Sequence, residues 1–102
     1  MVTRQEEGPM LFMMYCLDKP DSLELRLANR EAHLEYMTGE ASRVRIAGPV
    51  FSHDGETMQG SLFIVEANTI DEVQELNRND PYQIAGLFSD VTIRPFKKVI
   101  EN

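Results

Sequence analysis

The chain has 102 residues, of which 42% are apolar and 26% charged, a composition typical of one soluble globular domain, which we expect over residues 10–100. The net charge of −7 and the absence of any basic run longer than two residues exclude nucleic acid as an expected partner, because phosphate binding relies on clustered lysine and arginine. No apolar run approaches the roughly 20 residues of a membrane span, and the polar residues 1–9 do not resemble a signal peptide, so we expect a cytoplasmic protein with a flexible N-terminal tail.

The first half of the chain predicts a strand, a long helix and a second strand. Residues 10–17 are apolar at every position, which is typical of a strand that is buried on both faces. Asp21 or Ser22 provides a helix cap, and the helix is expected to continue to about Glu40. Residues 43–47 then alternate between polar and apolar side chains, which indicates a half-buried strand.

The second half repeats this order. The Asp-Gly pair at residues 54–55 indicates a hairpin turn, and residues 61–65 form another strand that is apolar on both faces. Thr69 and Glu72 have the spacing of a capping box at the start of a second helix. Residues 91–94 alternate again, and the proline that follows them is typical of an edge strand.

Together these elements predict an α+β fold of the ferredoxin-like βαββαβ type. The two strands that are apolar on both faces belong at the centre of a four-stranded antiparallel sheet, with two helices on one face. The central strands would then leave apolar side chains on the face that no helix covers. We therefore expect a homodimer, or a higher assembly of such dimers, in which two sheets pack face to face.

The first helix carries an unusual mixture of side chains. Its apolar stripe, which we expect to pack on the sheet, consists of Leu23, Leu27 and Leu34. Arg30 falls within this stripe, and Arg26 and His33 lie on its shoulder, where we expect the edge of a cleft. An arginine on an apolar stripe needs a carboxylate or a bound anion beside it.

Two interpretations of the arginines remain open at this stage. Arg30 either forms an ion pair with Asp80 or another acid, or binds a carboxylate or phenolate group of a substrate. Arg26 either shares that substrate contact or lies on a solvated face of the helix.

A series of short motifs runs through nearly the whole chain. They are Met10-Leu-Phe, Asp18-Lys-Pro-Asp-Ser-Leu-Glu, Ala32-His33-Leu34, Ala47-Gly48-Pro49, Asn79-Asp80-Pro81-Tyr82 and Arg94-Pro95-Phe96-Lys97-Lys98-Val99. In this order they resemble the YciI-like (YCII-related) family. The resemblance implies a ferredoxin-like fold that dimerises as in the dimeric α/β barrels, and a cleft with a His–Asp pair, which motif position assigns to His33 and Asp80. The family is similar to small enzymes that act on ring compounds, including a dehydrochlorinase.

The residues themselves favour the same pair. An imidazole exchanges protons near neutral pH, and an adjacent carboxylate fixes its tautomer. Because both predicted helices pack on the same face of the sheet, contact between His33 and Asp80 is feasible. The alternative is that His33 makes a local hydrogen bond and Asp80 only ends a helix. The functional hypotheses are accordingly a cofactor-independent lyase, isomerase or dehydrochlorinase, and a non-catalytic dimeric ligand-binding or scaffold module.

The remaining candidates concern a pocket for a small anionic or aromatic ligand. Tyr15 and Tyr82 either line this pocket or are core aromatics with satisfied hydroxyl groups. Ser61 is placed at the cleft by the resemblance alone. Cys16, the single cysteine, is interpreted as a small buried hydrophobe. No metal-ligand spacing and no glycine-rich phosphate loop occurs, so neither a metal nor another cofactor is expected.

Overall fold

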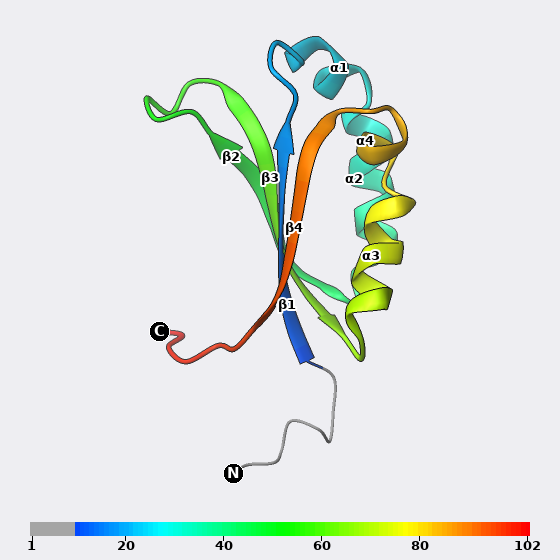
Figure 1. Cartoon of the computed structure of the whole chain (residues 1–102), viewed down its shortest axis with the longest axis vertical. Coiled ribbons are helices and arrows are strands. Elements are labelled where there is room, and N and C mark those ends of the chain that lie inside the picture. The colour runs from blue at the N-terminus through cyan, green and yellow to red at the C-terminus, as the bar shows by residue number, and fades with distance from the viewer. Residues whose placement is uncertain (1–9) are drawn as a thin grey trace.

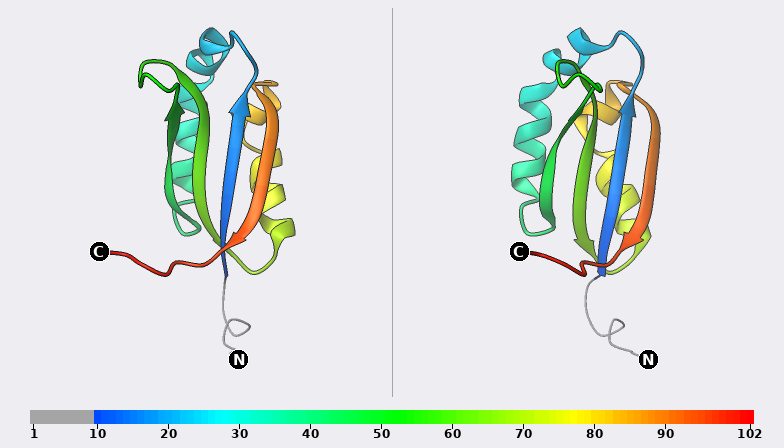
Figure 2. Two further views of the ribbon diagram at one scale, coloured as in Figure 1. Left: turned by 60° about the vertical axis from the view of Figure 1, so that its left-hand side comes forward. Right: turned by 90° about the vertical axis from the view of Figure 1, so that its left-hand side faces the viewer.

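The computed structural model describes residues 10–102 and confirms the ferredoxin-like fold. Four antiparallel strands form one sheet in the order β2-β3-β1-β4, and all helices lie on one side of it (Figures 1 and 2). The elements are β1 (Met10–Asp18), α1 (Leu23–Ala28), α2 (Arg30–Gly39), β2 (Val44–Phe51), β3 (Met58–Ala67), α3 (Ile70–Arg78), α4 (Pro81–Ile84) and β4 (Phe88–Phe96). The predicted tail over residues 1–9 lies outside the described residues.

The two strands that are apolar on both faces, β1 and β3, are the central strands, as predicted. Phe12, Met14 and Cys16 alternate along β1 and are fully buried on the side of the helices. Met14 lies opposite Phe63 of β3 in the antiparallel register, so the two strands share one core. Burying each large apolar side chain contributes roughly 1.5–3 kcal/mol, which makes this face the main source of stability.

The opposite face of the sheet has no helix over it (Figure 2). In the register of the sheet, Met13 lies opposite Ile64 and Tyr15 lies opposite Leu62, and these four residues alternate with the buried set. Leu62 remains 38% exposed. We call this surface the open face. Its apolar character agrees with the sequence pattern, whereas the face-to-face dimer stays a prediction.

The predicted single helix from residue 21 or 22 to residue 40 is wrong in one respect, because it is divided into α1 and α2 at Asn29. The backbone of Asn29 has φ −110° and ψ 6°, outside the helical region. Its side-chain Nδ2 donates to the carbonyl oxygen of Leu25 at 2.9 Å, and its backbone N–H bonds the carbonyl oxygens of Leu25 and Arg26. A short polar side chain that bonds nearby backbone in this way competes with regular helix geometry.

The apolar stripe of this helical segment is also not the buried face. Leu23, Leu27 and Leu34 are 42%, 52% and 44% exposed, whereas Arg26 and His33 are buried against the sheet together with one methionine of α2. The physical reason is that Arg26 and His33 each meet a buried carboxylate, which offsets the cost of desolvating them. The polar shoulder therefore faces inward and the stripe faces outward.

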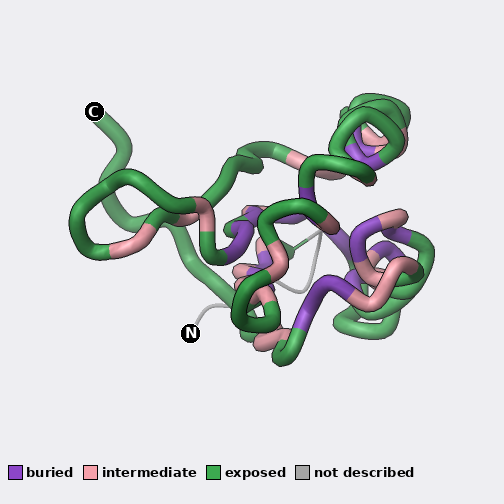
Figure 3. The backbone as a smooth tube through the Cα atoms, turned by 90° about the horizontal axis from the view of Figure 1, so that it is seen from above, coloured by how far each residue is buried: buried purple, intermediate pink, exposed green. Residues whose placement is uncertain are grey.

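The second half of the chain follows its local signals closely. The hydroxyl oxygen of Thr69 accepts from the backbone N–H of Glu72, which confirms the predicted cap of α3. Asp80 caps α4 in turn, with a proline at the first helical position. β2 runs from Val44 to Phe51 and passes through the Gly48-Pro49 pair, where an interruption is expected from the sequence, with two register shifts. Seen from above, buried positions gather between the sheet and the helices, and the segment after β4 is exposed throughout (Figure 3).

Candidate functional site

His33 and Asp80 form a buried hydrogen-bonded pair. Nδ1 of His33, on α2, lies 2.8 Å from Oδ1 of Asp80, the capping residue of α4. The same oxygen accepts from the backbone N–H of Tyr82 at 2.9 Å, which holds the carboxylate in place. Since an ionised carboxylate only accepts hydrogen bonds, this contact assigns the proton to Nδ1. In neutral His33 the lone pair is then on Nε2.

The second ring nitrogen is in a different environment. The side chain of His33 is 9% exposed, whereas that of Asp80 is fully buried. Within residues 10–102, Nε2 makes no hydrogen bond and is not one of the buried polar atoms that lack a partner. The accessible nitrogen is therefore the one that carries the lone pair, which is the arrangement that a general base needs.

The carboxylate of Asp80 also has an unused acceptor. His33 and Tyr82 both donate to Oδ1, while Oδ2 is buried without a partner among the described residues. An unsatisfied buried acceptor costs about 1–3 kcal/mol, and few occur in folded proteins. Asp80 is thus placed at some expense of stability, and a buried carboxylate oxygen without a partner is a candidate for a functional role.

The aromatic ring of Tyr82 connects the pair to a second charged cluster. It stacks on the imidazole of His33, with ring centroids 3.9 Å apart and planes 11° from parallel. The guanidinium carbon of Arg26 lies 4.8 Å from the centroid of the same ring, in cation–π distance. Burial raises the pKa of the Tyr82 phenol, although the positive charges of Arg26 and Arg30 oppose this. Tyr82 is accordingly a protonated, buried ring in contact with both Arg26 and His33.

Arg26 is held by protein groups on several sides. Its Nε and Nη2 donate to the two carboxylate oxygens of Asp18 at 2.8 and 3.1 Å, and Nη2 also donates to the hydroxyl of Ser61 at 2.7 Å. Burial acts to lower the pKa of Arg26, but the hydrogen bonds and charge of Asp18 raise it above its ordinary value. Arg26 is therefore a buried, paired cation, and the interpretation of a solvated helix face is wrong.

Arg30 and Tyr15 are placed differently from the buried pair. Arg30 is exposed, and within residues 10–102 it forms no ion pair; the predicted bond to Asp80 is absent, and Asp80 bonds His33 instead. Tyr15 points to the open face, where its ring borders Gly60. The structure therefore brings together His33, Asp80, Tyr82, Arg26 and Ser61, with Arg30 at the surface and Tyr15 across the sheet.

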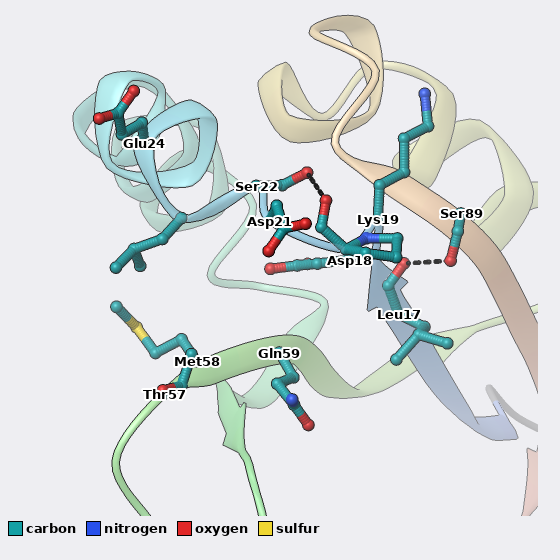
Figure 4. A pocket seen from close by; sticks show the side chains of 12 residues that line it. Leu17, Asp18, Lys19, Asp21, Ser22, Glu24, Thr57, Met58, Gln59 and Ser89 are labelled. Carbon is teal, nitrogen blue, oxygen red and sulfur yellow. Dashed lines mark hydrogen bonds between the residues drawn. The ribbon is translucent and has the colours of Figure 1, made fainter.

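A groove of about 760 Å³ lies next to this cluster, where the C-terminal end of β1 and the loop before α1 face the start of β3 (Figure 4). Its carboxylates are those of Asp18, Asp21 and Glu24, and its apolar walls include Leu17, Leu23 and Met58. None of the residues predicted as site residues lines it. Asp18, which the sequence reasoning did not single out, is the lining residue that binds Arg26. Its signal was its place in a motif directly before the first helix.

Cys16 is enclosed in the core. Its Sγ lies 4.0 Å from Oδ1 of Asn77, and burial, together with the charges of Asp80 and Asp18, raises the pKa of the thiol. The thiol is thus a protonated core group. Across residues 10–102, no three His, Cys, Asp or Glu side chains gather in a metal-binding arrangement, and no helix is long and apolar enough to cross a membrane.

Comparison with known proteins agrees with this fold. The YCII-related domain family matches residues 10–97. The chain belongs to the YCII-related family. Among YCII-related relatives, protein YciI of Escherichia coli O6:H1 is 37% identical over 97 residues, which cover 88% of this chain and 99% of the relative. An uncharacterized protein of Haemophilus influenzae is 34% identical over 97 residues, with the same coverage.

Solved structures extend the comparison. The 5-chloro-2-hydroxyhydroquinone dehydrochlorinase TftG from Burkholderia phenoliruptrix AC1100, in complex with 2,5-dihydroxybenzoquinone, is 37% identical to this YCII-related chain. The match covers 86% of this chain and 94% of TftG, with a TM-score of 0.79. Protein PA3566 from Pseudomonas aeruginosa is 12% identical with a TM-score of 0.55 over 93% of this chain and 98% of its own, a likeness of fold alone.

Proposed function

We propose that this protein is a cofactor-independent enzyme for a small molecule, in which His33 is the general acid/base and Asp80 orients it. The observation that carries the proposal is the hydrogen bond from Nδ1 of His33 to Oδ1 of Asp80, which leaves the lone pair on the accessible Nε2. The negative charge of Asp80 would also stabilise the imidazolium that forms when Nε2 takes a proton. A positioned acid/base group of this kind contributes roughly 10²–10⁴-fold to a rate.

The substrate class that we propose is a hydroxylated ring compound. TftG is named for acting on a chlorinated hydroxyhydroquinone and is 37% identical to this chain, which supports this class. In an elimination of HCl, Nε2 of His33 would accept the proton of a C–H or O–H group of the substrate, and the electron pair of that bond would form a new double bond in the product. The C–Cl bond would break with its own electron pair going to chloride. Arg30, an exposed cation near Tyr82, is the side chain that we propose to bind an anionic oxygen of the substrate.

We further propose that the working unit is a homodimer. The open face presents apolar side chains from both central strands, and a second copy of the same face is the complementary cover. Two sheets packed in this way would bury the side chains of Met13, Leu62 and Ile64 in a second core.

The proposal is tested by turnover of chlorinated hydroxyhydroquinones, followed as chloride release and as quinone absorbance. We expect His33→Gln and Asp80→Asn to lower kcat by at least about 10²-fold, with the fold retained by circular dichroism. His53→Gln, at the exposed hairpin turn, is the matched control and should keep wild-type turnover. Turnover that survives both changes would remove the pair from the mechanism. Binding of the ring compounds without any turnover would favour the non-catalytic ligand-binding module instead.

A further inference from the structure

The ion pair between Asp18 and Arg26 is almost completely buried, although burial of an ion pair adds little to stability. Both side chains are only 6% and 4% exposed. Desolvating two charges offsets most of their attraction, so a buried ion pair is often no more stabilising than apolar residues of similar volume. The pair is also not isolated, because Arg26 additionally bonds Ser61 and contacts Tyr82. Its contacts connect it to the candidate site.

The contacts form a continuous series from the groove to the imidazole. Asp18 lines the groove and binds the guanidinium of Arg26 through both carboxylate oxygens. The guanidinium lies over the ring of Tyr82, and the same ring stacks on His33 at 3.9 Å. His33 then donates to Asp80. Two carboxylates thus end the series, and Arg26 and His33 both contact the ring of Tyr82 between them.

We propose that the Asp18–Arg26 ion pair is a positioning element of the candidate site, which acts through Tyr82 to set the charge and orientation of His33 from the side of the groove. The inference deepens the proposed function and rests on it, since the charge of His33 matters for catalysis only if His33 is the acid/base group. In physical terms, the Asp18–Arg26 pair and the His33–Asp80 pair are coupled because Arg26 and His33 both contact the ring of Tyr82.

The charged and titratable groups around this ring come from every element packed against it. They are Cys16 and Asp18 from β1, Arg26 from α1, Arg30 from α2, and Asp80 and Tyr82 from the segment between α3 and β4, while the neighbouring Ser61 and Phe63 of β3 are uncharged. Cys16 and Tyr82 are neutral at pH 7, because burial raises the pKa of each. Besides His33 itself, the groups that carry a charge around the ring are therefore the two carboxylates and the two arginines.

The two members of the ion pair act on His33 with opposite sign. A positive charge at Arg26 repels the imidazolium, so Arg26→Met should make His33 easier to protonate and move its titration midpoint upward. A negative charge at Asp18 attracts the imidazolium and offsets Arg26, so Asp18→Asn should move the midpoint downward. At the effective dielectric of partly buried sites, we expect shifts of about 0.5–1 pH unit. A purely structural role would loosen the site in both variants and move both midpoints in the same direction.

The experiment is an NMR titration of the imidazole Cε1–H signals, in the background His53→Gln, which leaves His33 as the single histidine. Arg26→Lys keeps the positive charge and should leave the midpoint within about 0.3 unit of the parent; it is also the variant to compare if Arg26→Met does not fold. Arg45→Met and Glu66→Gln, which remove the two halves of an exposed ion pair on β2 and β3, are the matched controls and should produce no shift.

Opposite shifts for Arg26→Met and Asp18→Asn support the coupling. Shifts in the same direction, or shifts no larger than those of the Arg45 and Glu66 controls, overturn it. If Arg26→Met does not fold, an unchanged midpoint in Asp18→Asn overturns the coupling by itself. Because the titration requires no substrate, its outcome is separate from the turnover test of His33 and Asp80.

Discussion

His33 and Asp80 stand 47 positions apart in the chain, yet their Nδ1 and Oδ1 atoms are 2.8 Å apart. The helix that carries His33 and the cap that carries Asp80 lie on the same face of the sheet (Figure 1). The carboxylate is anchored independently by the backbone N–H of Tyr82, so its position does not depend on the histidine. This independence allows each residue to be changed separately.

Asp80→Asn should show whether the charge of the carboxylate matters for catalysis, because the change keeps the size of the side chain. An amide of the same shape can donate as well as accept, and it carries no charge to stabilise an imidazolium. We expect kcat to fall by about 10²–10⁴-fold while KM changes much less, because the change acts on proton transfer rather than on substrate binding. Steady-state kinetics on a hydroxylated ring substrate provides the measurement. A rise in KM of similar size, with kcat unchanged, would contradict this role.

Gly60→Ala should destabilise the central pair of strands. A Cβ atom at residue 60 would lie 2.6 Å from the backbone carbonyl oxygen of Cys16 and 3.3 Å from the ring of Tyr15. Backbone must shift to relieve this clash, and we expect a loss of about 1–3 kcal/mol in the free energy of unfolding. Gly48→Ala is the control on β2, because nothing lies within 4 Å of its added Cβ. Urea denaturation of both variants decides the matter; equal midpoints would contradict the close approach.

Cys16 should be unreactive in the folded protein. Because burial raises the pKa of the thiol, the reactive thiolate is scarce even at pH 9, and the side chain is inaccessible. We expect labelling by a maleimide only in denaturant, at a rate that follows unfolding. Rapid labelling of one thiol in native buffer would show that the core opens at β1.

The raised pKa of the Cys16 thiol also makes the stability of the fold depend on pH. The folded state holds the thiol proton more tightly than the unfolded state, so the contribution is complete below the ordinary thiol pKa of about 8.5 and is lost as pH rises above it. We expect the free energy of unfolding to fall between pH 8.5 and 10, and to fall less steeply in Cys16→Ala. Parallel slopes for the two proteins in urea titrations would refute the assignment.

The open face should control association. Leu62→Asp places a charge at the centre of the proposed interface, where its desolvation would oppose dimer formation. We expect the wild-type protein to have the mass of a dimer by light scattering at micromolar concentration, and Leu62→Asp to have that of a monomer. Leu34→Asp, on the outward stripe of α2 at similar exposure, should stay dimeric. A monomeric wild type would refute the face-to-face dimer.

The strand order could be predicted because the strands carry a complete signal in their own sequence. Residues 10–17 and 61–65 are apolar on both faces and must be central, and the cap at Thr69 is a purely local contact. The inward face of the first helix could not be predicted in this way. Its orientation depends on Asp18 and Asp80, which come from other elements and make it favourable to bury Arg26 and His33 in place of the leucines.

The contact between His33 and Asp80 was anticipated mainly through family resemblance, because spacing alone does not bring two loops or helices together. The role of Asp18 was missed for the same reason. An aspartate just before a helix is usually a solvated cap, whereas Asp18 ends β1 and bonds Arg26 of α1, which also bonds Ser61 of β3. The groove similarly combines three separate segments and has no signature in any one of them.

The prolines of the two outer strands limit how this protein can assemble. Pro49 of β2 and Pro95 of β4 lie on the two outer strands and have no backbone N–H, and a proline in an edge strand is one way in which natural sheets resist the addition of a further strand. Growth by strand addition would form an open, fibrous series, whereas pairing through one face closes after two copies. The outer-strand prolines thus act against open-ended growth, which is compatible with the closed face-to-face pair that we propose.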